Sequence, residues 1–165
     1  MLGDDSLSEL AAPQGSEGRS KRVFIVNGSH PFLELLDEFL TVESYDVVVS
    51  FTLSVTFEQI LAFDPDVLII DIIAFDNHGW ELLEQIHSSA SMNQVPVIII
   101  STSPDVIDQA KAQVERYGGD YYLAKPLDLE ELLSKVNQAT RSTCSSREQL
   151  APERDSSGTA PRLRP

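Results

Sequence analysis

Short apolar runs alternate five times with helical patterns, and this alternation most constrains how the chain of 165 residues can fold. The apolar runs are rich in Val and Ile and mostly lack polar alternation, which is typical of strands covered on both faces. They predict five strands, at Val23–Val26, Asp46–Phe51, Asp66–Ile70, Pro96–Ser101 and Tyr121–Ala124. The segments that follow predict five helices, at Pro31–Val42, Val55–Phe63, Trp80–Ser88, Pro104–Tyr117 and Leu129–Thr140.

Several helix ends carry recognisable signals. Ser103 followed by Pro104 is typical of an N-cap with a proline at the first helical position. Asp128 with Glu131 three residues later resembles a capping box, and Gly118 is a natural C-terminal stop. Strand–helix units in this order predict an α/β fold: a doubly wound, mostly parallel sheet with helices on both faces.

The folded part is flanked by two polar segments. Residues 1–20 are rich in Gly, Ser, Pro and acids, and we expect a disordered N-terminal tail. Residues 142–165 show almost no apolar periodicity, and we expect a second disordered tail, too short and polar to form an output domain. The expected organisation is therefore a single stand-alone domain over residues 21–141.

The charge is strongly acidic and unevenly placed. The formal net charge is −14, and no Lys or Arg occurs from Val23 to Ala110. Such a surface repels phosphate backbones and anionic lipid, so we expect no nucleic-acid partner and no membrane partner. Apolar runs such as Val95–Ile100 are too short to span a bilayer, the N-terminus lacks an apolar signal region, and Cys144 is the only cysteine. These features favour a cytoplasmic protein.

Polar side chains follow several predicted strands. In open parallel sheets, the functional crevice lies beyond the carboxyl ends of the strands. Asp71 stands at the end of the third predicted strand, Ser101-Thr102 at the end of the fourth, and Lys125 after the fifth. A carboxylate there would serve as a nucleophile toward a phosphoryl group, while the hydroxyl would donate a hydrogen bond and the ammonium would neutralise charge.

Around these residues the sequence resembles the receiver domain of two-component response regulators. The similar pieces are PDVLIID around Asp71, Gly79 eight residues later, PVIIIST around Ser101, and GGDYYLAKP around Lys125. The spacings of 30 residues from Asp71 to Ser101 and 24 from Ser101 to Lys125 also fit the family. The resemblance covers roughly residues 21–140 and implies a flavodoxin-like (βα)5 sheet with strand order 2-1-3-4-5.

The resemblance also implies site roles. Asp71 would be the phosphoacceptor, Ser101 the switch hydroxyl with Thr102 beside it, Lys125 the phosphate-pairing cation and Tyr122 the rotating aromatic. The implied partners are a histidine kinase or phosphotransfer protein, and a downstream protein. The downstream protein would bind the face made by the fourth helix, fifth strand and fifth helix, which holds Lys111, Arg116 and Lys135.

One departure from the family concerns magnesium. Receivers usually carry two acids at the end of the first strand that help to hold Mg²⁺, and here these positions are Asn27 and Gly28. The implied ligands are then Asp71, the backbone carbonyl of Ile73 and, at best, the neutral amide oxygen of Asn27. If each lost acid costs roughly tenfold in affinity, Mg²⁺ binding is weak or absent. We also expect a direct Asp71–Lys125 pair that forms without metal or phosphate.

Two signalling functions and one enzymatic function remain open at this point. Asp71, Ser101 and Lys125 favour a phosphoreceiver, whereas Asn27-Gly28 favours a pseudo-receiver that binds partners independently of phosphorylation. An enzyme is disfavoured because an aspartate-based phosphohydrolase wants a second acid two residues after Asp71, where this chain has Ile73. The loop VNGSHP also has a single Gly, which does not fit a nucleotide-binding loop.

Overall fold

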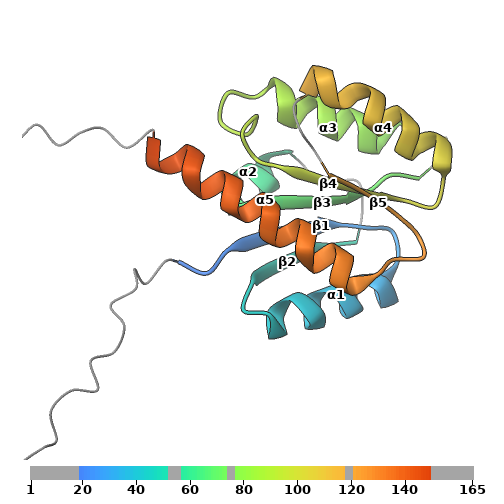
Figure 1. Cartoon of the computed structure of the whole chain (residues 1–165), viewed down its shortest axis with the longest axis horizontal. Coiled ribbons are helices and arrows are strands. Elements are labelled where there is room, and N and C mark those ends of the chain that lie inside the picture. Colours follow the sequence, from blue (N-terminus) through green and yellow to red (C-terminus); the bar gives the residue numbers. More distant parts are fainter. Residues whose placement is uncertain (1–18, 52–56, 74–76, 118–120, 150–165) are drawn as a thin grey trace, which may run out of the picture.

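The computed structural model describes residues 19–51, 57–73, 77–117 and 121–149, with side chains undescribed at 113–117 and 144–149. Five strands and five helices alternate along this part of the chain (Figure 1). The strands are β1 (Arg22–Val26), β2 (Asp46–Ser50), β3 (Val67–Asp71), β4 (Val97–Ser101) and β5 (Tyr121–Ala124). The helices are α1 (His30–Val42), α2 (Phe57–Phe63), α3 (His78–Ser88), α4 (Pro104–Tyr117) and α5 (Leu129–Gln149).

The strands form one parallel sheet in the order β2-β1-β3-β4-β5. The expected fold class and strand order are therefore confirmed. Every residue of β3 and β4 is buried, because these central strands are covered on both faces. The parallel order brings the carboxyl ends of β1, β3, β4 and β5 to one edge of the sheet.

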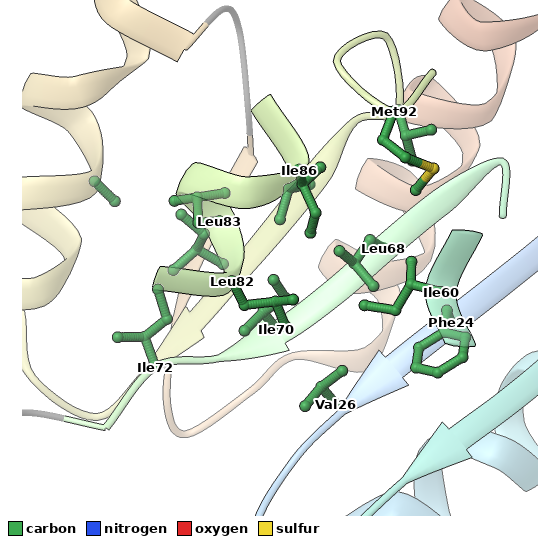
Figure 2. Packing of buried hydrophobic residues seen from close by; sticks show 14 of the residues in the cluster. Phe24, Val26, Ile60, Leu68, Ile70, Ile72, Leu82, Leu83, Ile86 and Met92 are labelled. Atoms are coloured by element: carbon green, nitrogen blue, oxygen red, sulfur yellow. The ribbon is translucent and has the colours of Figure 1, made fainter. Parts of the chain in front are cut away.

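Two hydrophobic clusters pack on opposite faces of the sheet. One joins α1 and α5 to the strands and includes Ile25, Leu36, Ile69 and Leu132. The other contains Phe24, Val26, Leu68, Ile70 and Ile72 from the strand side with Ile60, Leu82, Leu83, Ile86 and Met92 opposite, and Figure 2 shows their packing. Alternate side chains of each central strand thus enter opposite cores, which fixes the strand register.

The predicted helix starts at Pro104 and Leu129 are confirmed, and Asp128 caps α5 with its side chain. The Asp128 carboxylate accepts hydrogen bonds from the backbone N–H groups of Glu130 and Glu131 at 2.8 and 3.2 Å. Helix α4 begins at Pro104, and the backbone carbonyl of Ser103 accepts the Ile107 N–H bond at 3.2 Å. The predicted stop at Gly118 lies outside the described residues. Among those residues, no helix is long and apolar enough to cross a membrane.

The predicted C-terminal boundary is wrong in one respect. Helix α5 continues to Gln149, so residues 142–149 belong to a helix and not to a tail. The prediction depended on the periodicity of large apolar residues, which is absent here. Thr143 is nevertheless buried, and its hydroxyl donates hydrogen bonds to the carbonyls of Asp66 and Ala139 at 3.0 and 3.2 Å. The Thr143 hydroxyl thus connects α5 to Asp66, the residue before β3. The other tail predictions, for residues 1–18 and 150–165, lie outside the described part.

Replacing Thr143 with Val is expected to lower the free energy of unfolding by about 1 kcal/mol, because the buried Asp66 carbonyl loses the hydroxyl that donates to it. Val keeps nearly the same shape, so the loss reports the hydrogen bond. Denaturant unfolding followed by circular dichroism measures it. The matched control is Ser142→Ala, which removes an exposed hydroxyl from the same helix and should change stability by less than about 0.5 kcal/mol. Equal effects of the two substitutions would contradict the docking role of Thr143.

Candidate functional site

Asp71 is the last residue of β3 and lies at the carboxyl edge of the sheet. Its side chain is 9% exposed, so its carboxylate is almost entirely removed from water. A buried carboxylate requires hydrogen-bond donors or a positive charge near it. Two side chains from neighbouring strand ends meet this requirement.

Lys125 and Asn27 both donate to the same oxygen of Asp71. The Lys125 Nζ lies 2.6 Å from Asp71 Oδ2, and the Asn27 Nδ2 lies 2.9 Å from it. Lys125 directly follows β5, and Asn27 directly follows β1. The Asp71–Lys125 pair expected from the sequence is therefore confirmed as a contact. The carboxylate is neutralised by one ammonium group and oriented by one amide.

Lys125 is also fixed from a second direction. Its Nζ lies 4.6 Å from the centre of the Phe32 ring of α1, within the range of a cation–π contact. The peptide bond between Lys125 and Pro126 is cis. Sequence reasoning missed Phe32, which looked like one more apolar residue of the first helix.

Asn27 is buried and uses both ends of its amide. While its Nδ2 donates to Asp71, its Oδ1 accepts the backbone N–H of Ser29 at 2.7 Å. The second bond shapes the turn from β1 into α1. From the sequence we considered only the amide oxygen as a metal ligand and missed the donor. The residue type alone allowed a donor role to be predicted, because an Asn amide always carries both a donor and an acceptor.

Ser101 ends β4 and is fully buried. Its hydroxyl donates to the backbone carbonyl of Ile72 at 2.6 Å and accepts the backbone N–H of Ser103 at 3.2 Å. The hydroxyl therefore ties the loop after β3 to the loop after β4. Thr102 is the next residue along the chain and is exposed.

Tyr122 lies farther from the carboxylate, in the middle of β5, and pairs in register with Ile99. It is half-buried against the cluster that α3 and α4 share with the sheet. The Lys111 Nζ of α4 lies 5.1 Å from its ring centre. Because side chains alternate along a strand, Tyr122 is on the same face of the sheet as Ser101, whose register partner is Ala124.

The side chains at this edge do not fit a magnesium site. Among the described residues, no group of three or more His, Cys, Asp or Glu side chains is placed to hold a metal. Mg²⁺ prefers several oxygen ligands in octahedral geometry. Here Asp71 Oδ2 already accepts two donors, and the Asn27 oxygen is bonded to the chain. Ile73, whose carbonyl was the third predicted ligand, is half-exposed two residues after β3.

Comparison with known proteins agrees with this fold. The model of the response regulator receiver domain matches residues 23–137. The chain is 28% identical over 120 residues to the response regulator ArlR of Staphylococcus saprophyticus and to that of Staphylococcus aureus. Each match covers 73% of this chain and 52% of the relative, so the chain spans about half the length of these curated relatives.

Solved structures give the same fold. A two-component response regulator from Clostridium difficile is 25% identical, with a TM-score of 0.63, over 74% of this chain and 97% of that one. The chemotaxis protein CheY4 of Vibrio cholerae is 20% identical, with a TM-score of 0.63, over 73% and 99%. The second likeness is one of fold alone. Because the family model covers well over half of the sequence, this chain belongs to the response regulator receiver domain family.

Proposed function

We propose that this receiver domain signals through Asp71, which accepts a phosphoryl group from a histidine kinase or phosphotransfer protein. The observation that carries the proposal is the buried Asp71 carboxylate, held 2.6 Å from the Lys125 ammonium at the carboxyl edge of the sheet. A carboxylate oxygen attacks the phosphorus of a phosphohistidine, and the new O–P bond forms as the N–P bond breaks. The histidine nitrogen takes up a proton, and Lys125 remains as counter-ion to the acyl phosphate.

The output is protein contact and not catalysis. The face formed by α4, β5 and α5 carries Lys111 and Lys135, two of the few bases in the folded part, and it includes Tyr122. Ser101 ends β4, the strand between β3 and β5, and its hydroxyl donates to the backbone carbonyl of Ile72. A phosphoryl group on Asp71 would compete for that hydroxyl and so disturb the link between the loops after β3 and β4.

The net charge of −14 disfavours nucleic acid and anionic membranes as direct partners of this chain. We place its action in the cytoplasm, within reach of a kinase. The stand-alone character expected from the sequence stays a prediction, because the curated relatives are about twice as long as the part that matches.

Incubating the protein with acetyl phosphate tests the phosphoacceptor. We expect an intact mass higher by one phosphoryl group, and no increase for Asp71→Asn. The matched control Asp105→Asn, which changes an exposed acid in the first turn of α4, should label like the native chain. Labelling that persists in Asp71→Asn, or that is absent from the native chain both with and without Mg²⁺, would contradict the proposal.

A second function, a phosphorylation-independent interaction module, is favoured by one contact: the Asn27 amide bonded to Asp71 at 2.9 Å, where the family usually has an acid. Beryllofluoride, added with and without Mg²⁺, separates the two functions, because it mimics a bound phosphoryl group. The amide NMR signals around Ser101 and Tyr122 should shift if the domain is phosphoresponsive. They should stay in place if the pocket serves partner binding only.

A further inference from the structure

The side chains around Asp71 disagree with the magnesium ion that the family implies. We propose that Asn27 and Lys125 take the place of this cation, so that Asp71 works without a divalent metal. The inference rests on Asp71 being the functional carboxylate and adds how the site is regulated: its state is set by protein donors and does not depend on metal concentration.

Both the nitrogen and the oxygen of the Asn27 side-chain amide are hydrogen-bonded within the protein. Its Nδ2 donates to Asp71 Oδ2 at 2.9 Å, and its Oδ1 accepts the Ser29 N–H at 2.7 Å. Only one orientation of the amide satisfies a carboxylate on one side and an N–H group on the other. The oxygen that would be offered to a cation therefore points toward the loop backbone, and a donor points toward Asp71.

The electrostatics disfavour a cation at Asp71 Oδ2. Lys125 already brings one positive charge to within 2.6 Å of Asp71 Oδ2. A divalent ion bound there would lie close to this ammonium group and to the Asn27 Nδ2–H, both of which repel it. Asp71 supplies the carboxylate that opposes these positive groups, and no group of three or more His, Cys, Asp or Glu side chains among the described residues is placed to hold a metal.

Positions 27 and 28 lack the acidic side chains that the family usually has, but position 28 has space for a side chain. A Cβ atom built on Gly28 would have Ile73 Cδ1 at 3.9 Å as its nearest neighbour, which is ordinary van der Waals contact. An acid at position 28 is therefore sterically acceptable, and Asn27→Asp preserves the size of the side chain. The two substitutions together restore three carboxylates at one edge of the sheet.

The test compares the native chain with the double variant Asn27→Asp/Gly28→Asp by calorimetric titration with Mg²⁺ and Mn²⁺. We expect binding by the native chain to be too weak to saturate in the titration. Binding by the variant should saturate, because its affinity is higher by roughly 100-fold if each acid contributes about tenfold. Without metal the variant should melt at a lower temperature, because three carboxylates repel one another. Mg²⁺ should raise its melting temperature and leave that of the native chain unchanged.

Asn27 has a spectroscopic signature of its own. Its side-chain NH₂ signals in the native chain should be displaced from those of exposed Asn residues, and Asp71→Asn should shift them. The control Asp105→Asn should not. Addition of a metal chelator should leave both the signals and the rate of Asp71 labelling by acetyl phosphate unchanged.

Three outcomes would overturn the inference. The first is saturable Mg²⁺ binding by the native chain that Asp71→Asn removes. The second is a folded double variant that binds Mg²⁺ no better than the native chain. If the double variant does not fold, the single variant Gly28→Asp is tested in its place. The third outcome is that this variant binds Mg²⁺ no better than the native chain. Failure of Asp71 labelling in every protein would instead reject the phosphoacceptor, because the metal titrations do not depend on it.

Discussion

Replacing Lys125 with Met is expected to lower the free energy of unfolding by about 2 kcal/mol, because it leaves the Asp71 carboxylate buried without its counter-charge. Removing one partner of a fully buried ion pair costs about 3–5 kcal/mol. Here the side chains are 9% and 21% exposed, so solvent reduces the penalty. The bond from Asn27 to the same oxygen reduces it further, although a neutral amide cannot replace a positive charge.

Chemical denaturation of the native chain, Asp71→Asn, Lys125→Met and the double variant measures this pair as a double-mutant cycle. The double variant should be more stable than the sum of the single losses predicts, with a coupling energy of about 1–2 kcal/mol. Asp71→Asn alone should cost less than Lys125→Met, since the ammonium group keeps its contact with Phe32 and is closer to water.

The chain provides a matched control in Lys135. Its side chain is 25% exposed, similar to that of Lys125, but its partner Glu131 is 58% exposed and 3.7 Å away. Surface pairs of this kind contribute about 0.3–0.5 kcal/mol. If Lys135→Met and Lys125→Met reduced stability equally, the Asp71–Lys125 pair would not be the element that holds the pocket.

The fold could be predicted from the sequence because local signals agreed with the topology. Buried strands in this chain are continuous apolar runs, and helix starts such as Asp128 carry capping side chains. The strand order came from the family resemblance, since apolar runs alone do not say which strands are neighbours. The C-terminal part of α5 was missed because its burial depends on Thr143, a small polar residue that periodicity does not mark.

The site was predicted as a set of residues but not as a network. Strand ends brought Asp71, Ser101 and Lys125 to one edge, and the rule of the carboxyl edge sufficed for that. The sequence did not show which atoms are already occupied. Asn27 donates to Asp71, and Ser101 donates to a backbone carbonyl, because buried polar groups satisfy one another before any ligand arrives.

The second large effect is expected at Ile69, two residues before Asp71 on β3. Its side chain is fully buried between the strands and the α1–α5 face. Replacing it with Ala removes three carbon atoms from a close-packed core and leaves a cavity, which for Ile→Ala substitutions costs about 2–5 kcal/mol. We expect about 3–4 kcal/mol, because both neighbouring strands and two helices hold the surrounding atoms in place.

Denaturant unfolding of Ile69→Ala tests the contribution of this core to the site. The control is Val49→Ala on the edge strand β2, where the side chain is 38% exposed and the expected loss is below about 1 kcal/mol.

Because Ile69 and Asp71 share one strand and one face of the sheet, the Asn27 side-chain NH₂ signals report whether the cavity reaches the site. We expect them to stay in place, since the Asn27 amide and the Lys125 ammonium group fix the carboxylate independently. A loss of less than 1 kcal/mol for Ile69→Ala would show that the central sheet does not carry the stability on which the Asp71 pocket depends.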